Sequence, residues 1–274
     1  MKIIVVQNKV EYSKSQNFKQ IDDLLLKENL KDFDFIVLPE MFLCPYELDM
    51  FDKHKEDLDG ESIRYLKSLA IKYSCYVVGG SIPFKDKSKL YNTTFIFNRI
   101  GDIIARYDKI HLFEVVYPDG TTFNESNKLS RGDNVVTFDT EFGPMGVMIC
   151  FDIRFPELSY ELMKKNASVI FVPAAFNTYT GPMHWSTTFQ SRAIDNQLFI
   201  VGSSPSSNSV GDYNVYGHSL VVDPFGKILF EMDNTSGCFT IDLDLSKINE
   251  ARSKIPIIRN RVFKWKKGYH ECFY

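Results

Sequence analysis

Apolar stretches of strand length alternate with segments of helical periodicity along the whole chain. Short apolar stretches with polar boundaries predict buried strands at 2–7, 35–38, 75–78, 168–172, 198–203 and 238–243. Apolar residues at helical spacing predict helices at 17–30, 62–73, 184–196 and 245–254. A further helix is expected after Cys150, with Pro156 in its first turn, where the missing N–H of proline is harmless.

The middle of the chain has a pattern typical of antiparallel pairs. Short turns separate the strands of three predicted pairs, 93–98 with 103–107, 135–139 with 146–150, and 217–223 with 227–232. No repeat or long linker interrupts the chain. Helices near both ends with hairpins between them predict one α/β domain of layered sheets covered by helices, residues 1–274, ending in a tail at about 262–274.

Composition and charge restrict the class of protein. With 44% hydrophobic and 24% charged residues and a net charge of −3, the chain has an ordinary globular composition. It has no extended basic patch, so we expect binding neither to nucleic acid nor to a membrane. The short apolar start, Met1 to Gln7, is too short for a signal peptide, and a cytoplasmic location is expected.

Cysteine and histidine spacing gives no sign of a metal or cofactor. The five cysteines are scattered without a C-x-x-C pair, and the five histidines lie far apart in the sequence. This spacing indicates neither a disulfide framework nor a zinc ribbon. We therefore expect no metal and no cofactor.

Cys150 is the strongest candidate for chemistry. It follows an apolar strand and opens into a turn that leads to a helix. Backbone N–H groups at such a turn favour a thiolate and the oxyanion that its attack creates. Most cysteines are instead small buried hydrophobes, so the interpretation depends on which other groups the fold brings to this turn.

Three more polar residues stand at the ends of apolar stretches or in loops. Glu40 follows a buried strand, Lys109 follows a hairpin strand, and Glu125 lies in a loop. Residues at strand ends commonly form binding and catalytic sites. A charged residue of this kind, taken alone, is more often a solvated loop charge.

Together these positions resemble the nitrilase superfamily of carbon–nitrogen hydrolases. Four segments carry the likeness in the family's order: Leu38-Pro39-Glu40, Asp108-Lys109-Ile110-His111-Leu112, Phe123-Asn124-Glu125-Ser126 and Ile149-Cys150-Phe151-Asp152-Ile153-Arg154-Phe155-Pro156-Glu157. The segments 173–185, 190–197 and 216–219 are similar to the ω-amidase branch. The likeness extends from Ile3 to about Arg261, and Phe151 replaces a tyrosine frequent in relatives. It implies a four-layer α-β-β-α sandwich, with two mixed β-sheets flanked by helices, and pairing of subunits into a homodimer or higher homo-oligomer.

The resemblance also implies roles for the four polar residues. Cys150 is the expected nucleophile, Glu40 the general base, Lys109 the oxyanion stabiliser and Glu125 a second, positioning carboxylate. A free thiol has a pKa of about 8.5 and is mostly protonated at neutral pH, so a carboxylate that accepts its proton is required. The thioester formed on Cys150 would then be hydrolysed by water.

The expected substrate is a small amide with a distant carboxylate. Arg154 lies close to the nucleophile in sequence, and its planar guanidinium suits a carboxylate. The resemblance implies that Arg154 and Thr180 bind that carboxylate, that the N–H of Phe151 holds the oxyanion, and that Phe176 and His184 line the pocket. The expected substrates are short dicarboxylate monoamides, such as 2-oxoglutaramate or 2-oxosuccinamate. Alternatively, Arg154 pairs internally with Asp152 or Glu157.

The sequence is also compatible with other functions. A nitrilase or an N-carbamoyl amidohydrolase would use the same thioester chemistry, and an inactive ligand-binding or scaffold protein could share the fold. A serine hydrolase is disfavoured because the sequence has no G-x-S-x-G motif. The nucleotide-binding patterns G-x-G-x-x-G and the P-loop are absent as well.

Overall fold

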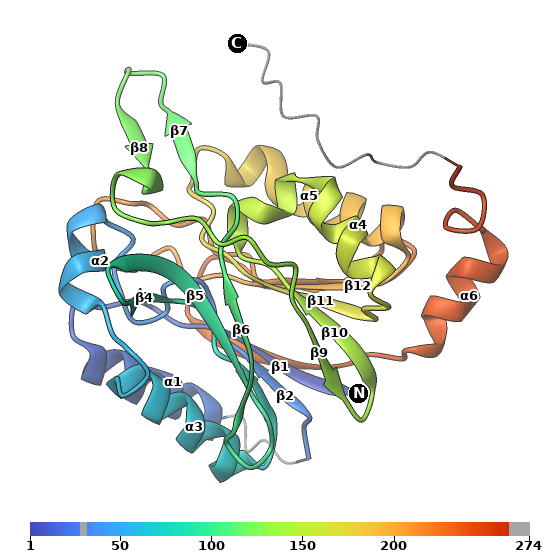
Figure 1. Cartoon of the computed structure of the whole chain (residues 1–274), viewed down its shortest axis with the longest axis horizontal. Helices are drawn as coiled ribbons and strands as arrows, with labels where there is room; N and C mark the ends of the chain where they lie inside the picture. Colours follow the sequence, from blue (N-terminus) through green and yellow to red (C-terminus); the bar gives the residue numbers. More distant parts are fainter. Residues whose placement is uncertain (28–31, 263–274) are drawn as a thin grey trace.

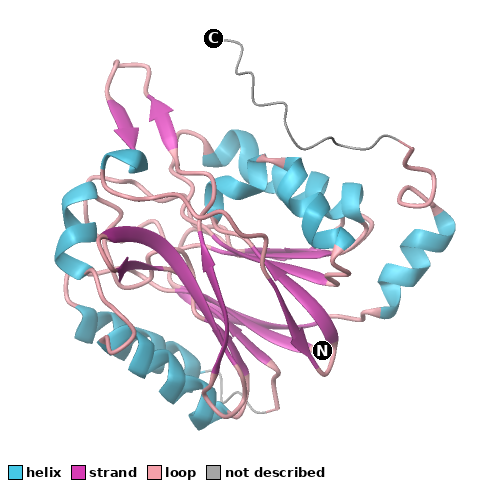
Figure 2. Cartoon of the chain, in the orientation of Figure 1, coloured by secondary structure: helices cyan, strands magenta, loops and turns pink. Residues whose placement is uncertain are grey.

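Two β-sheets form the centre of the molecule (Figures 1 and 2). The computed structural model describes residues 1–27 and 32–262. The first sheet has seven strands in the order β15-β1-β2-β3-β5-β4, with β6 also paired to β5. Their bounds are β1 Lys2–Gln7, β2 Phe35–Val37, β3 Tyr76–Val78, β4 Ile82–Asp86, β5 Lys89–Phe97, β6 Ile103–Asp108 and β15 Gly237–Asp242.

The second sheet has six strands in the order β14-β13-β12-β11-β10-β9. Their bounds are β9 Thr137–Thr140, β10 Gly143–Val147, β11 Val169–Pro173, β12 Phe199–Ser203, β13 Leu220–Val222 and β14 Ile228–Glu231. In each sheet three neighbouring strands are parallel, β1-β2-β3 and β10-β11-β12, and the flanking strands are antiparallel. Both sheets are therefore mixed, as expected.

Helices cover the outer faces of the two sheets (Figure 2). The helices are α1 Lys14–Lys27, α2 Leu48–His54, α3 Glu61–Tyr73, α4 Pro156–Lys164, α5 Gly181–Asn196 and α6 Ser246–Lys254. Apolar residues of α1 and α3 pack on the first sheet, and those of α4 and α5 pack on the second. The approach of α5 is close, because the ring of Phe189 fills the space where a side chain at Gly202 would lie. The four-layer α-β-β-α sandwich is confirmed.

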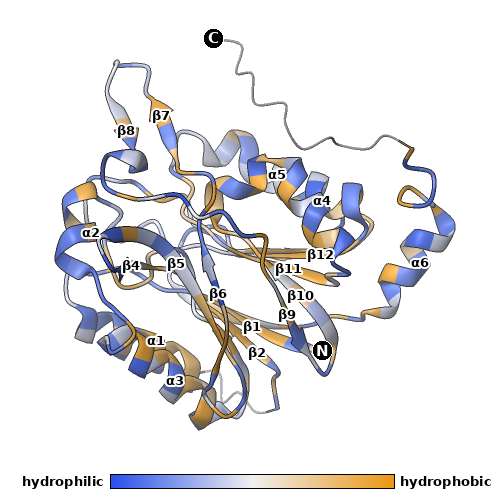
Figure 3. Ribbon diagram, in the orientation of Figure 1, coloured by the Kyte–Doolittle hydropathy of each residue, from blue (hydrophilic) through white to orange (hydrophobic). Residues whose placement is uncertain are grey.

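The core between the sheets follows from the two-residue alternation of the strands. In β1, Ile3 and Val5 face the second sheet, whereas Ile4 and Val6 face the helices. Phe35 of the first sheet stacks on Phe171 of the second, with ring centroids 5.1 Å apart. Figure 3 shows the apolar residues concentrated along the central strands.

Several local features differ from the sequence-based expectations. The strand expected at 146–150 ends at Val147, and Cys150 adopts a φ of +48° and starts the 3₁₀ turn η2 Cys150–Arg154. The helix expected after this turn is confirmed as α4, with Pro156 as its first residue. Helix α1 starts at Lys14, and residues 28–30 of the expected helix lie outside the described residues. The tail beyond residue 262 also lies outside them.

The sequence analysis did not predict α2, β4 or the small hairpin of β7 Glu114–Val116 and β8 Thr122–Asn124. This hairpin extends away from the sandwich (Figure 1). Within the described part of the chain, no helix combines the length and the apolar character needed to cross a bilayer.

The contact of Phe35 with Phe171 predicts a large loss of stability when it is removed. Phe35→Ala should lower the free energy of unfolding by about 3–5 kcal/mol, because a fully buried ring leaves a cavity between the sheets. Urea titration followed by circular dichroism measures this. Ile100→Ala, at a side chain that is 70% exposed, is the control and should cost less than about 0.5 kcal/mol. Equal losses for the two variants would contradict the assigned core.

Candidate active site

Cys150 lies beyond the C-terminal end of β10 in the second sheet, three residues after Val147. Its φ of +48° is a conformation that non-glycine residues rarely adopt, and such strain concentrates at functional sites. The N–H of Ala175, which follows the neighbouring parallel strand β11, points at the Cys150 sulfur from 3.5 Å. The side chain is 3% exposed, so the thiol lies in a water-poor environment.

The other three predicted residues form one buried cluster. Lys109 Nζ lies 2.8 Å from Glu40 Oε1 and 2.9 Å from Glu125 Oε2, and all three side chains are fully buried. Glu40 follows β2, Lys109 follows β6, and Glu125 opens the 3₁₀ turn η1 Glu125–Asn127. The Cys150 thiol interacts with the Glu40 carboxylate and with the Lys109 charge. The structure thus brings together all four residues that the sequence analysis singled out.

Two residues of this cluster were not found from the sequence. The Tyr46 hydroxyl lies 2.7 Å from Glu125 Oε1 and 3.2 Å from Glu40 Oε1. Asn92 Nδ2, on β5, donates to the same Glu40 oxygen at 2.8 Å. Lys109 also donates to Oε1, so no N–H or O–H group of the described residues donates to Glu40 Oε2. That oxygen is free to take up a proton.

Burial decides the protonation state of the thiol. Burial raises the pKa of Cys150 well above its usual value, the Glu40 carboxylate raises it further, and Lys109 opposes the rise only in part. Burial likewise raises the pKa of Glu40, against the lowering effect of Lys109. Burial alone would lower the pKa of Lys109, but Glu125 and Glu40 outweigh it and raise that pKa. The resting site therefore holds a neutral thiol beside a permanent ammonium.

Four of the five predicted substrate-binding residues also meet. Arg154 Nη1 donates to His184 Nδ1 at 2.9 Å, and the guanidinium lies over the rings of Phe176 and Phe151, 4.6 and 5.7 Å from their centroids. Thr180 is the residue before α5, and its hydroxyl donates to Asn177 rather than to a group of this cluster.

The alternative pairing of Arg154 with Asp152 or Glu157 is wrong. Among residues 1–27 and 32–262, neither Asp152 nor Glu157 forms an ion pair with the Arg154 guanidinium within 4.0 Å. Asp152 is buried and bonded to Tyr107 and His111 instead. No carboxylate of the described residues is therefore paired with the Arg154 cation.

A cleft of about 830 Å³ lies beside the polar cluster. Its walls come from the start of α2, the β7–β8 hairpin and the loops around residues 177–179 and 212–214. Tyr46 lies on its wall, and the Tyr46 hydroxyl contacts both buried glutamates. Cys150, Lys109 and the two glutamates do not line the cleft, so Tyr46 is the residue that the cleft and the cluster share.

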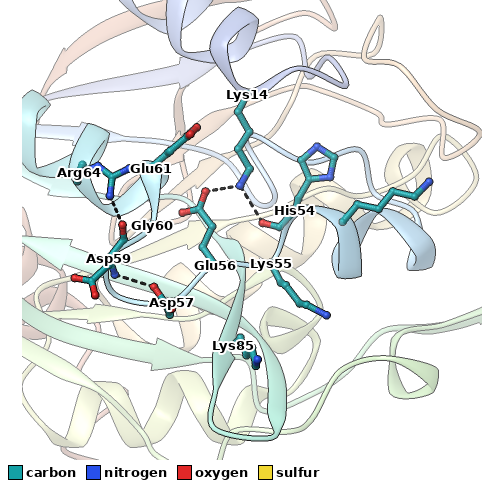
Figure 4. Close-up of a pocket in the computed structure, with 11 residues that line it drawn as sticks. Lys14, His54, Lys55, Glu56, Asp57, Asp59, Gly60, Glu61, Arg64 and Lys85 are labelled. Carbon is teal, nitrogen blue, oxygen red and sulfur yellow. Dashed lines mark hydrogen bonds and ion pairs between the residues drawn. The ribbon is translucent and has the colours of Figure 1, made fainter.

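A second hollow, of about 700 Å³, lies between the starts of α1 and α3 (Figure 4). Within it, Lys14 donates to Glu56 and to the carbonyl oxygen of His54, and Arg64 donates to the carbonyl oxygen of Asp59. None of the predicted catalytic or substrate-binding residues lines this second hollow. No group of three or more His, Cys, Asp or Glu residues that could hold a metal ion occurs within residues 1–27 and 32–262.

An α-β-β-α sandwich with a Glu-Lys-Glu-Cys cluster at the ends of its sheets has the form expected of a hydrolase of carbon–nitrogen bonds. Residues 2–253 match the family model Carbon-nitrogen hydrolase, and the chain belongs to this family. The protein is therefore a carbon–nitrogen hydrolase.

Relatives of known name support this membership. Omega-amidase NIT3 of Saccharomyces cerevisiae is 42% identical over 238 residues, covering 85% of this chain and 82% of that protein. Omega-amidase NIT2 of Homo sapiens is 36% identical over 260 residues, covering 95% and 94%. The crystal structure of S. cerevisiae Nit3, a member of branch 10 of the nitrilase superfamily, superimposes with a TM-score of 0.86 at 36% identity, covering 96% of this chain and 97% of that one.

The raised pKa of Glu40 predicts the pH dependence of activity. If ionised Glu40 accepts the thiol proton, kcat/KM falls as the pH drops through that pKa, so the acid limb should lie above the ordinary glutamate value of 4.5. Ammonia release measured between about pH 4 and 8 at constant ionic strength tests this. Circular dichroism at each pH is the control for unfolding, and a limb at or below 4.5 in a folded protein would contradict the assignment.

Proposed function

We propose that the protein is an ω-amidase, which hydrolyses the terminal amide of short dicarboxylate monoamides such as 2-oxoglutaramate or 2-oxosuccinamate and releases ammonia. The observation that carries the proposal is the Arg154 guanidinium, which has no carboxylate partner among the described residues and belongs to the same turn as Cys150. The names of the relatives NIT3 and NIT2 support the same activity.

Acylation begins with the neutral thiol. As the Cys150 sulfur attacks the amide carbon, its proton moves to Glu40 Oε2, the oxygen that no other group in the described structure engages. Negative charge grows on the amide oxygen, where the Lys109 ammonium and the backbone N–H of Phe151 hold it. Glu40 then gives its proton to the leaving nitrogen, ammonia departs, and a thioester remains on Cys150.

Deacylation reverses the proton movements. Glu40, ionised again, takes a proton from a water molecule that attacks the thioester carbon. Lys109 and Phe151 hold the second oxyanion as they held the first. The Cys150 sulfur leaves with a proton from Glu40, and the free acid is released.

Glu125 is a positioning residue in this scheme. Its Oε1 accepts from Tyr46 at 2.7 Å, and its Oε2 accepts from the Phe113 N–H at 2.6 Å and lies 2.9 Å from Lys109. Because both oxygens are engaged, Glu125 is poorly suited to transfer a proton. It keeps Lys109 charged and fixes the direction of the ammonium.

Arg154 is arranged to bind the far carboxylate. His184 Nδ1 accepts a hydrogen bond from one nitrogen of the guanidinium and leaves the others available. The rings of Phe176 and Phe151 pack on the cation, and burial lowers the pKa of Arg154, a shift that Cys150 and Tyr213 oppose only in part. A substrate carboxylate supplies the anionic partner that the guanidinium lacks among the described residues. This arrangement favours an ω-amide over an uncharged nitrile.

Subunit pairing, location and the class of partner are further parts of the proposal. We infer that subunits pair into a homodimer or higher homo-oligomer, and that the protein is cytoplasmic and acts on small molecules. Ile194 on α5 is 42% exposed and lies against Gly226 of the β13–β14 turn, and Phe225 of the same turn is 37% exposed. These exposed apolar side chains are compatible with an association surface at this place.

Removing the guanidinium should affect only substrates that carry a carboxylate. Arg154→Ala should lower kcat/KM for 2-oxoglutaramate by about 10- to 100-fold, the value of one charge-assisted hydrogen-bonded pair. Hydrolysis of a neutral amide of the same length should change by less than about threefold. Steady-state ammonia release on both amides measures the contrast. An equal change on the two amides would remove the support for an ω-amidase.

Removing the nucleophile distinguishes an enzyme from an inactive scaffold. Cys150→Ala should abolish ammonia release while leaving the thermal unfolding temperature close to that of the wild type, since the change removes only a sulfur atom from a buried site. Assays on ω-amides, nitriles and N-carbamoyl acids with both proteins also separate the three hydrolase classes. Unchanged ammonia release by Cys150→Ala would overturn the proposed nucleophile.

A further inference from the structure

Asp152 is a buried carboxylate that takes no part in the proton transfers described above. Its side chain is fully buried, and each of its oxygens accepts two hydrogen bonds. Oδ2 accepts from the Tyr107 hydroxyl at 2.6 Å and from the Ile149 N–H at 3.0 Å. Oδ1 accepts from the His111 N–H at 2.9 Å and lies 2.8 Å from His111 Nδ1. Four donors on one carboxylate make a fully satisfied buried network.

The residues that donate to Asp152 lie close in sequence to Cys150 and Lys109, the two groups that must both contact the substrate. Ile149 directly precedes Cys150, whereas Tyr107 and His111 lie two residues before and two residues after Lys109. One carboxylate therefore joins the turn that carries the sulfur, beyond the second sheet, to the segment that carries the ammonium, beyond the first. The backbone of Asp152 belongs to the same turn, because its N–H donates to the Ile149 carbonyl at 3.0 Å.

The linkage matters because Cys150 has an unfavourable backbone conformation. A φ of +48° at a non-glycine residue persists only where the surroundings impose it. The bonds between Ile149 and Asp152 close the turn around Cys150 on one side. On the other side the His111 ring stacks on Phe155, the residue after the turn, with centroids 3.7 Å apart. The turn is thus closed by its own Ile149–Asp152 bonds and held against the Lys109 segment through Tyr107 and His111.

We propose that Asp152 is a positioning residue for the carbon–nitrogen hydrolysis, which fixes the Cys150 sulfur and the Lys109 ammonium at the separation that one carbonyl group requires. This inference rests on the proposed role of Cys150 as nucleophile but not on the identity of the substrate. A displacement of about 1 Å between reacting groups can cost about 100-fold in rate without weakening substrate binding. Loss of Asp152 therefore acts on kcat rather than on KM.

The first test replaces the carboxylate by its isosteric amide. Asp152→Asn cannot accept all four bonds, because its amide nitrogen faces donors, so kcat should fall about 100-fold while KM stays within about threefold. The rate of alkylation of Cys150 by iodoacetamide, which needs no substrate assignment, should fall about 10-fold. Thermal unfolding of each variant is recorded in parallel.

The matched control is Asp223→Asn. Asp223 is also a buried turn carboxylate, 2% exposed, and accepts from the Phe225 and Lys227 N–H groups between β13 and β14. The variant Asp223→Asn should lower stability as Asp152→Asn does. It should leave kcat and the alkylation rate within about twofold of the wild type. A purely structural role of Asp152 would make the two variants behave alike, and that result overturns the proposal.

Tyr107→Phe keeps the test decisive if Asp152→Asn does not fold. It removes one hydroxyl from the network and should lower kcat about 10-fold with KM unchanged. Where both variants fold, the double variant should be no slower than Asp152→Asn alone, because the two residues act as one unit. A kcat for Tyr107→Phe within about threefold of the wild type contradicts the proposal. An active Cys150→Ala would instead refute the proposed nucleophile, so the two failures are distinguishable.

Discussion

The buried ion cluster of Lys109 with Glu40 and Glu125 is the constraint on which the rest of the site depends. An ammonium with no exposed surface is strongly unfavourable unless carboxylates lie against it, and both of them do, at 2.8 and 2.9 Å. The two carboxylates in turn need donors, which Tyr46 and Asn92 supply. Because these residues come from distant parts of the chain, the cluster fixes the ends of several strands relative to one another.

The cluster also determines how the thiol is activated. Many reactive cysteines are thiolates stabilised by a neighbouring cation. Here the negative charge on Glu40 and the burial of Cys150 together outweigh Lys109, and the pKa of the thiol is raised. In the proposed mechanism the nucleophile therefore forms only as its proton leaves for Glu40. A buried neutral thiol is also less exposed to oxidation than a thiolate at the surface.

The sequence predicted the layers and the four reactive residues better than their surroundings. Apolar periodicity located the central strands, and motif likeness located Glu40 and Cys150. Asn92 and Asp152 were missed because their importance lies in hydrogen bonds across strands and sheets, which no local pattern encodes. The β7–β8 hairpin was missed because its strands are short and contain no buried residue, so they lack the apolar signal on which such predictions depend.

The two sheets contribute different parts of the proposed chemistry. The ends of the first sheet carry Glu40 and Lys109, the proposed acid–base and charge-stabilising groups, and the ends of the second carry Cys150 and the N–H of Ala175. The distance between sulfur and ammonium is therefore a distance between sheets, set at long range by core contacts such as Phe35 with Phe171 and locally by polar bonds. Rigid sheets suit this task, because a strained turn such as that at Cys150 keeps its shape only against an unyielding support.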